Sequence, residues 1–116
     1  MQSYAINELS IAANTTTANV LSGSPIQFIG KPGVLTIYGN ADAVGCTNAL
    51  SLNDGQSTSS IIPVGSGLGA ASTAGKVKTN EDFIGQFPIP ASVQLIHSVT
   101  NTTGAAVKVN FNYVIT

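Results

Sequence analysis

Apolar and polar residues alternate along the last part of the chain, which is the pattern of a β-strand with one buried face. From residue 107 onward one face is apolar and consists of Val107, Val109, Phe111, Tyr113 and Ile115. The other face is mostly polar and consists of Lys108, Asn110, Asn112 and Thr116, with Val114 as the exception. The segment from Ser92 to Thr100 alternates in the same way, with His97 on its apolar face. We predict two strands here, joined into a C-terminal hairpin by residues 101–104.

Further strands are predicted upstream. The β-branched and aromatic segment Val34–Tyr38 lies between Gly-containing turns, and short apolar patterns at residues 26–29 and 3–12 indicate two more strands. The segments Cys46–Leu52 and Thr58–Val64 flank Asn53-Asp54-Gly55, a strong hairpin-turn signal. A second hairpin is therefore predicted at this turn.

Two segments lack strand patterning. Residues 65–76 consist mostly of Gly, Ser and Ala and predict a long flexible loop. Residues 81–90 contain Gly85 and two prolines, which limit any helix there to a single turn. The whole pattern predicts an all-β protein: one small antiparallel β-sandwich domain over residues 1–116, jelly-roll-like, with about eight short strands.

The chain carries unusually little charge. Charged residues make up 8% of the 116 residues, about a third of the usual share. With four Lys and no Arg, the chain has no basic patch for a phosphate backbone, so we expect no specific nucleic-acid partner. No apolar stretch approaches the ~20 residues that cross a bilayer, so we expect no membrane contact. The first residues lack the basic and apolar regions of a secretion signal, so we expect folding in a cytoplasm or removal of a leader upstream.

Residues with catalytic or metal-binding chemistry are few. His97 and Cys46 are the single histidine and the single cysteine, so neither a disulfide nor a zinc site of several Cys or His residues can form within one chain. The segment Gly69–Lys76 resembles a phosphate loop but has the wrong glycine spacing and no Ser or Thr after its Lys. Asn80, Glu81 and Asp82 offer too few oxygens for calcium. We expect no catalytic residue, no metal and no cofactor, and therefore no enzyme.

Low charge favours association, because it removes long-range repulsion and because Thr, Ser and Ala are buried at an interface more easily than charged side chains. A carbohydrate-binding sandwich is an alternative, since such folds stack sugars on exposed aromatic rings. The chain has no Trp, and its three tyrosines, Tyr4, Tyr38 and Tyr113, are equally suited to core packing. Another alternative is that the chain is a subunit of a self-assembling coat or fibre.

The layout of the chain resembles that of the small all-β virion proteins of bacteriophages: about a hundred residues, low charge, and a final pair of strands at 93–99 and 107–115. This resemblance implies a single jelly roll that serves as a capsid cement or decoration protein, commonly a trimer, or as a minor capsid or spike component. It implies a virion location, after synthesis in the host cytoplasm, and two partners, a second copy of the chain and the major capsid protein of a virus. The lack of Arg favours the outer surface of the capsid over its genome-facing interior.

Contacts between subunits are expected in the flexible loop and in an N-terminal segment, Gln2–Thr17, that orders on binding. The candidate interface residues are Ser66, Leu68, Ser72, Thr73, Tyr4, Ile6, Thr16 and His97. For His97, two positions remain open at this point, the core or a subunit contact. At a contact, its protonation would make assembly pH-sensitive.

Overall fold

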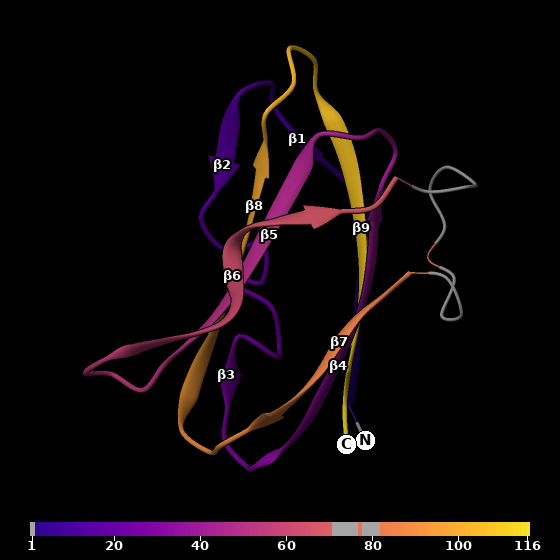
Figure 1. Ribbon diagram of the computed structural model, residues 1–116. Helices are drawn as coiled ribbons and strands as arrows, with labels where there is room; N and C mark the ends of the chain where they lie inside the picture. The colour runs from indigo at the N-terminus through magenta and orange to yellow at the C-terminus, as the bar shows by residue number, and fades with distance from the viewer. Residues whose placement is uncertain (1, 71–76, 78–81) are drawn as a thin grey trace.

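Strands account for all the regular structure in a computed structural model that describes residues 2–70, 77 and 82–116. Within these residues the chain forms nine strands and no helix (Figure 1). The strands are β1 (Gln2–Ile11), β2 (Thr15–Thr17), β3 (Phe28–Ile29), β4 (Gly33–Ala41), β5 (Cys46–Asn53), β6 (Thr58–Leu68), β7 (Phe83–Ile89), β8 (Val93–Asn101) and β9 (Val107–Ile115). The predicted all-β class is confirmed.

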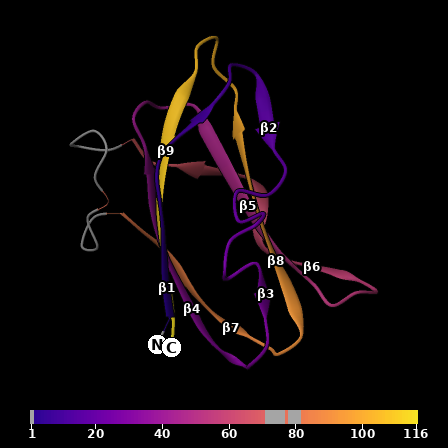
Figure 2. The ribbon, with the colours of Figure 1, turned by 180° about the vertical axis from the view of Figure 1, so that it is seen from behind.

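The strands form two antiparallel sheets that pack as a sandwich (Figures 1 and 2). Sheet A has the order β1-β9-β4-β7, and sheet B has the order β2-β8-β5-β6, with β3 also paired to β8. If β2 and β3 are taken as one interrupted strand, the pairs nest: β1 with β9, β2 and β3 with β8, β4 with β7, and β5 with β6. This nesting, with the pairs divided between two sheets, is the strand order of a jelly roll, so the predicted sandwich is confirmed.

The inward faces of both sheets form one apolar core. In β9 the buried side chains are those of the alternating apolar face, including Val109, Phe111 and Tyr113. In β8 the inward residues are Val93, Leu95, His97, Val99 and Asn101. Period-two patterning therefore placed Val93, Leu95, His97, Val99 and the β9 side chains on the correct face. Asn101 was expected in the connection, but it is the last residue of β8.

The predicted C-terminal hairpin is wrong, because β8 lies in sheet B and β9 lies in sheet A. The two strands face each other across the core, where the His97 and Phe111 rings lie 4.6 Å apart between centroids. The connection between the sheets is held by Asn101, whose Nδ2 donates to the carbonyls of Ile11 at 3.0 Å and Ala105 at 2.8 Å. Alternation is the same for a hairpin and for two strands packed face to face, so it does not distinguish these arrangements.

The predicted β5–β6 hairpin is confirmed, with Asn53 opposite Thr58. Gly55 has a φ of +97°, and the Asn53 Oδ1 accepts its N–H at 2.7 Å. The Asp54 Oδ1 accepts the N–H groups of Gln56 and Ser57, both at 2.9 Å. Local side-chain hydrogen bonds of this kind explain why the turn was readable from sequence.

Two other predictions change. The flexible loop expected at 65–76 is wrong for residues 65–68, which complete β6, while 71–76 lie outside the described residues. The helical turn allowed at 81–90 is wrong as well, because Phe83–Ile89 forms β7. Since β7 is the edge of sheet A, Pro88 in it needs no ladder partner for the N–H that it lacks. The N-terminal segment, expected to order on binding, already forms β1 and β2 in this structure.

Candidate functional site

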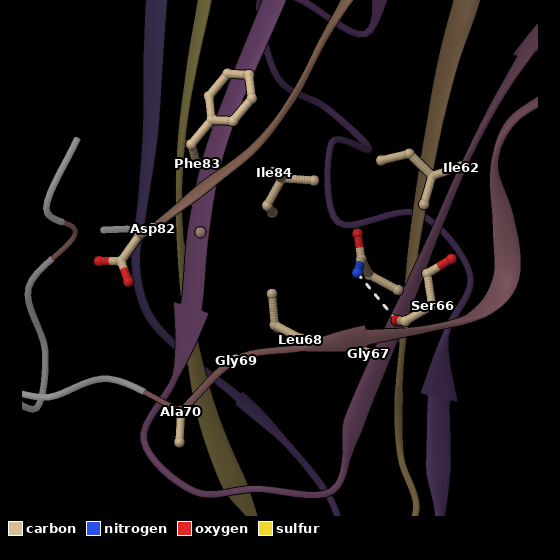
Figure 3. Close-up of a pocket in the computed structure, with 11 residues that line it drawn as sticks. Ile62, Ser66, Gly67, Leu68, Gly69, Ala70, Asp82, Phe83 and Ile84 are labelled. Carbon is tan, nitrogen blue, oxygen red and sulfur yellow. Dashed lines mark hydrogen bonds between the residues drawn. The ribbon is translucent and has the colours of Figure 1, made fainter. Parts of the chain in front are cut away.

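A cleft lies between β6 and β7, the edge strands of the two sheets (Figure 3). Its volume is about 410 Å³. Ile62, Leu68 and Ile84 point into it from its two sides (Figure 3). Glycines at 39, 67 and 69 also line it and leave the space open.

One end of the cleft is closed by the chain that leaves β6. The Ala41 N–H donates to the Gly69 carbonyl at 3.0 Å, and Ala70 forms a parallel bridge with Ala41. The chain thus crosses from sheet B to sheet A directly after Leu68. Gly65, at a φ of +88°, and the register shifts opposite Asn48 and Leu50 bend β6 toward this crossing.

A neutral hydrogen-bond network lies behind the cleft wall. The Asn48 Nδ2 donates to the Ser66 carbonyl at 3.2 Å, which turns the Asn48 Oδ1 toward the His97 Nε2 at 2.9 Å. Nε2 therefore carries the ring proton, and Nδ1 accepts from the Tyr113 hydroxyl at 2.7 Å. His97 is 0% exposed, and burial lowers its pKa from 6.5 to about 4. Burial also raises the pKa of Tyr113, so the hydroxyl keeps its proton.

A second buried network lies on the opposite face of sheet A. Asn40 and Asn110 face away from the core, yet both are 0% exposed. The Asn110 Nδ2 donates to the Asn40 Oδ1 at 3.0 Å, and the Asn40 Nδ2 donates to the Asp82 Oδ2 at 3.0 Å. The Asn110 Oδ1 accepts the N–H of Glu8 at 2.7 Å. Glu8 has a φ of 53° and belongs to a bulge in which two β1 residues oppose one β9 residue, so Asn110 stabilises that bulge.

The side chains of the inner network are engaged with one another. Both ring nitrogens of His97 are engaged by Asn48 and Tyr113, so its side chain is committed to holding the sheets together. Burial raises the pKa of the Cys46 thiol, with the Asp42 carboxylate as the second cause, which opposes thiolate formation. Among the described residues, no three His, Cys, Asp or Glu side chains are grouped so as to hold a metal ion.

The predicted interface residues fall into separate places. Ser66 and Leu68 line the cleft, Thr16 is exposed on β2, and Tyr4 stacks on Tyr113 at the edge of sheet A. Ser72 and Thr73 lie outside the described residues.

Three of these side chains are buried and have little surface to offer a partner. Ile6 and Leu68 are core residues at 9% and 5% exposure, and His97 is enclosed completely. Two positions were open for His97, the core and a subunit contact. Its complete burial places it in the core.

The outward face of sheet B was missed by sequence reasoning. Its five strands contain no Asp, Glu, Lys or Arg, and all of their residues are described. The outward side chains of its two central strands are small, aliphatic or amide, and half-buried: Thr47, Ala49, Ser51, Asn53, Gln94, Ile96, Ser98 and Thr100. The sequence shows that the chain carries little charge. That uncharged residues gather on one face depends on the order of the strands, which could not be predicted from the sequence.

Exposed apolar side chains were also missed. Phe28, Val44, Val64 and Phe83 are more than half exposed, with Val64 at 91%. The signal for Phe28 was its place beside Ile29 in a strand, because adjacent strand residues face opposite sides.

No helix within the described residues has the length and apolar character needed to span a membrane. Searches against protein-family models, curated proteins and solved structures found no match to this chain.

Proposed function

We propose that this protein is a structural subunit of a virus particle, a capsid cement, decoration or minor capsid protein that stabilises the shell through contacts between subunits. The proposal is supported above all by the uncharged outward face of sheet B on a jelly-roll sandwich. Jelly rolls serve in viral capsids, in lectins and in cupins. The second candidate function, saccharide binding, is favoured by a hollow at the end of the same sheet, lined by Phe28, Asp54 and Gln94.

The outward face of sheet B is suited to burial against another protein. Burying a charged side chain at an interface is costly unless it is paired, whereas small hydroxyl and aliphatic side chains lose little hydration. Thr16 and Thr100 already satisfy each other through their hydroxyls at 2.8 Å. The five strands of sheet B thus present a broad face from which no ion has to be removed when a partner docks.

The solution mass of the purified chain tests this proposal. We expect light scattering after gel filtration to give a small discrete oligomer, with a trimer favoured. Substitution S98K in the centre of the face should convert it to monomer while the melting temperature stays close to that of the wild type. An unpaired ammonium is costly when an interface buries it, but it is tolerated on a surface that faces water. The matched control is S3K on sheet A, which should leave the mass unchanged.

Other masses would change the proposal. Particles of megadalton size would favour the coat or fibre alternative. A monomeric wild type, or an oligomer unaffected by S98K, would contradict assembly through this face.

A further inference from the structure

A second hollow lies at the end of sheet B, where β3 meets β8 and the turn of the β5–β6 hairpin. Its volume is about 340 Å³, at the lower end of the range for small-molecule sites. Its walls combine apolar and polar side chains: Phe28, Ile29, Asn53, Asp54, Val93 and Gln94. The cleft between β6 and β7 lies elsewhere and shares none of these residues.

Phe28 gives this hollow an accessible aromatic ring. Its side chain is 68% exposed, while the neighbouring Ile29 is 7% exposed in the core. Phe28 pairs with Gln94 in β8, and Gln94 pairs with Asn53 in β5, so the three form one row across the outward face. Because Phe28 contributes little buried surface to the fold, the ring is available for a ligand.

The polar groups beside this ring are held in fixed places. The Oδ1 of Asp54 accepts two backbone N–H groups, which anchor its carboxylate on the turn. The side chain of Asn53 is engaged within the hairpin, because its Nδ2 donates to the Thr58 hydroxyl at 2.9 Å. No residue that the structure describes hydrogen-bonds to the side-chain amide of Gln94. An anchored acceptor and an unused amide therefore lie next to an aromatic ring.

We propose that this hollow binds a neutral saccharide, with the C–H face of one pyranose ring on Phe28 and hydroxyl groups on the Asp54 carboxylate and the Gln94 amide. A sugar ring has an apolar C–H face that can pack on the Phe28 ring, and hydroxyl groups on its rim that can donate to the Asp54 carboxylate. Among the described residues that line the hollow, Asp54 alone is charged, and its negative charge repels sugars that carry a carboxylate or sulfate. This inference goes beyond the proposed structural function. It concerns the end of the outward face of sheet B, beside the β5–β6 turn, whereas the S98K test probes the centre of that face.

Ligand-observed saturation-transfer NMR tests the site with the full chain. The probes are the methyl glycosides of glucose, galactose, mannose and N-acetylglucosamine at millimolar concentration. We expect saturation of at least one of them, strongest on the C–H protons of one ring face. Substitution F28A should weaken binding by about tenfold, because aromatic anchors dominate small contact surfaces. Substitution D54N, which keeps the side-chain oxygen that accepts the turn N–H groups, should weaken it as well.

F83A provides the matched control, because Phe83 is also an exposed phenylalanine, at 56%, but lies on β7 in the other sheet. It should leave the saturation signals unchanged. Absence of signal from all four glycosides, or equal signals from F28A and the wild type, would overturn the site. A change of solution mass in F28A without loss of a sugar signal would instead identify Phe28 as a contact between copies of the chain.

Discussion

Two buried polar networks lie on opposite faces of sheet A, both built on β9, and they differ in what they hold together. On the inner face, Tyr113 joins His97 and Asn48 of sheet B, so this network connects the two sheets. On the outer face, Asn110 joins Asn40 and the Glu8 N–H, so the second network connects strands within sheet A.

The networks also differ in charge. The inner one contains only neutral groups, because burial keeps both His97 and Tyr113 in their uncharged forms. The outer one includes a carboxylate, that of Asp82. In the inner network the polar groups form a paired neutral set, whereas the carboxylate of Asp82 belongs to the network on the side away from the core.

Removal of Asn48 should break the inner network and give the largest effect. In N48A, the His97 Nε2–H loses its acceptor and the Ser66 carbonyl loses its donor. We expect the free energy of unfolding to fall by about 3 kcal/mol in urea titrations. The control N112A removes a half-buried amide from the outward face of β9 and should cost about 0.5 kcal/mol. Equal losses in the two variants would contradict a structural role for the inner network.

Acid should weaken the inner network over a defined pH range. The pKa of His97 is about 4 in the folded chain and 6.5 in the unfolded chain. The unfolded state therefore binds more protons between these values, and stability is fully present above pH 6.5 and lost as the pH falls toward 4. The loss amounts to about 3 kcal/mol at most.

Denaturant titrations across this range test the assignment to His97. We expect H97Q to show a flat response between pH 4 and 6.5. Asp54, whose pKa is lowered by backbone hydrogen bonds, contributes only below its ordinary pKa of 3.8. A slope that persists in H97Q would assign the pH dependence to another group.

Removal of Asn110 should have a smaller and more local effect. In N110A, the Glu8 N–H loses its acceptor inside the β1 bulge, and we expect a loss of about 2 kcal/mol. Amide hydrogen exchange at Glu8 should accelerate relative to the paired amides of β9. The pH dependence between 4 and 6.5 should match that of the wild type, because His97 is untouched. Unchanged protection of the Glu8 amide would show that the outer network does not hold the bulge.

Sequence patterns predicted those parts of the fold that depend on neighbouring residues. The turn at Asn53-Asp54-Gly55 was readable because its own side chains stabilise it. The apolar face of β9 was readable because alternation reports which side chains are buried. The division of β8 and β9 between two sheets was not readable, because it depends on contacts between strands far apart in the chain.

The same limit applies to the surfaces that carry the proposals. His97 shared a face with Val93, Leu95 and Val99, but its partner Asn48 is 49 positions away, so its enclosure could not be inferred. Phe28 and Ile29 are both apolar, and which of them faces outward depends on how β3 meets β8. Long-range pairing, rather than local propensity, decides which side chains become surface.

Nested pairing also determines when this chain can fold during synthesis. Gln2 lies opposite Ile115, so β1 has no partner in its sheet until the residues of β9 have been made. β4 and β5 likewise wait for β9 and β8 on one of their sides. Only the β5–β6 hairpin can form early. Sheet A should therefore be completed only after translation of β9, and a ribosome stalled before residue 107 should carry a chain in which β1 lacks its partner and strand edges are exposed.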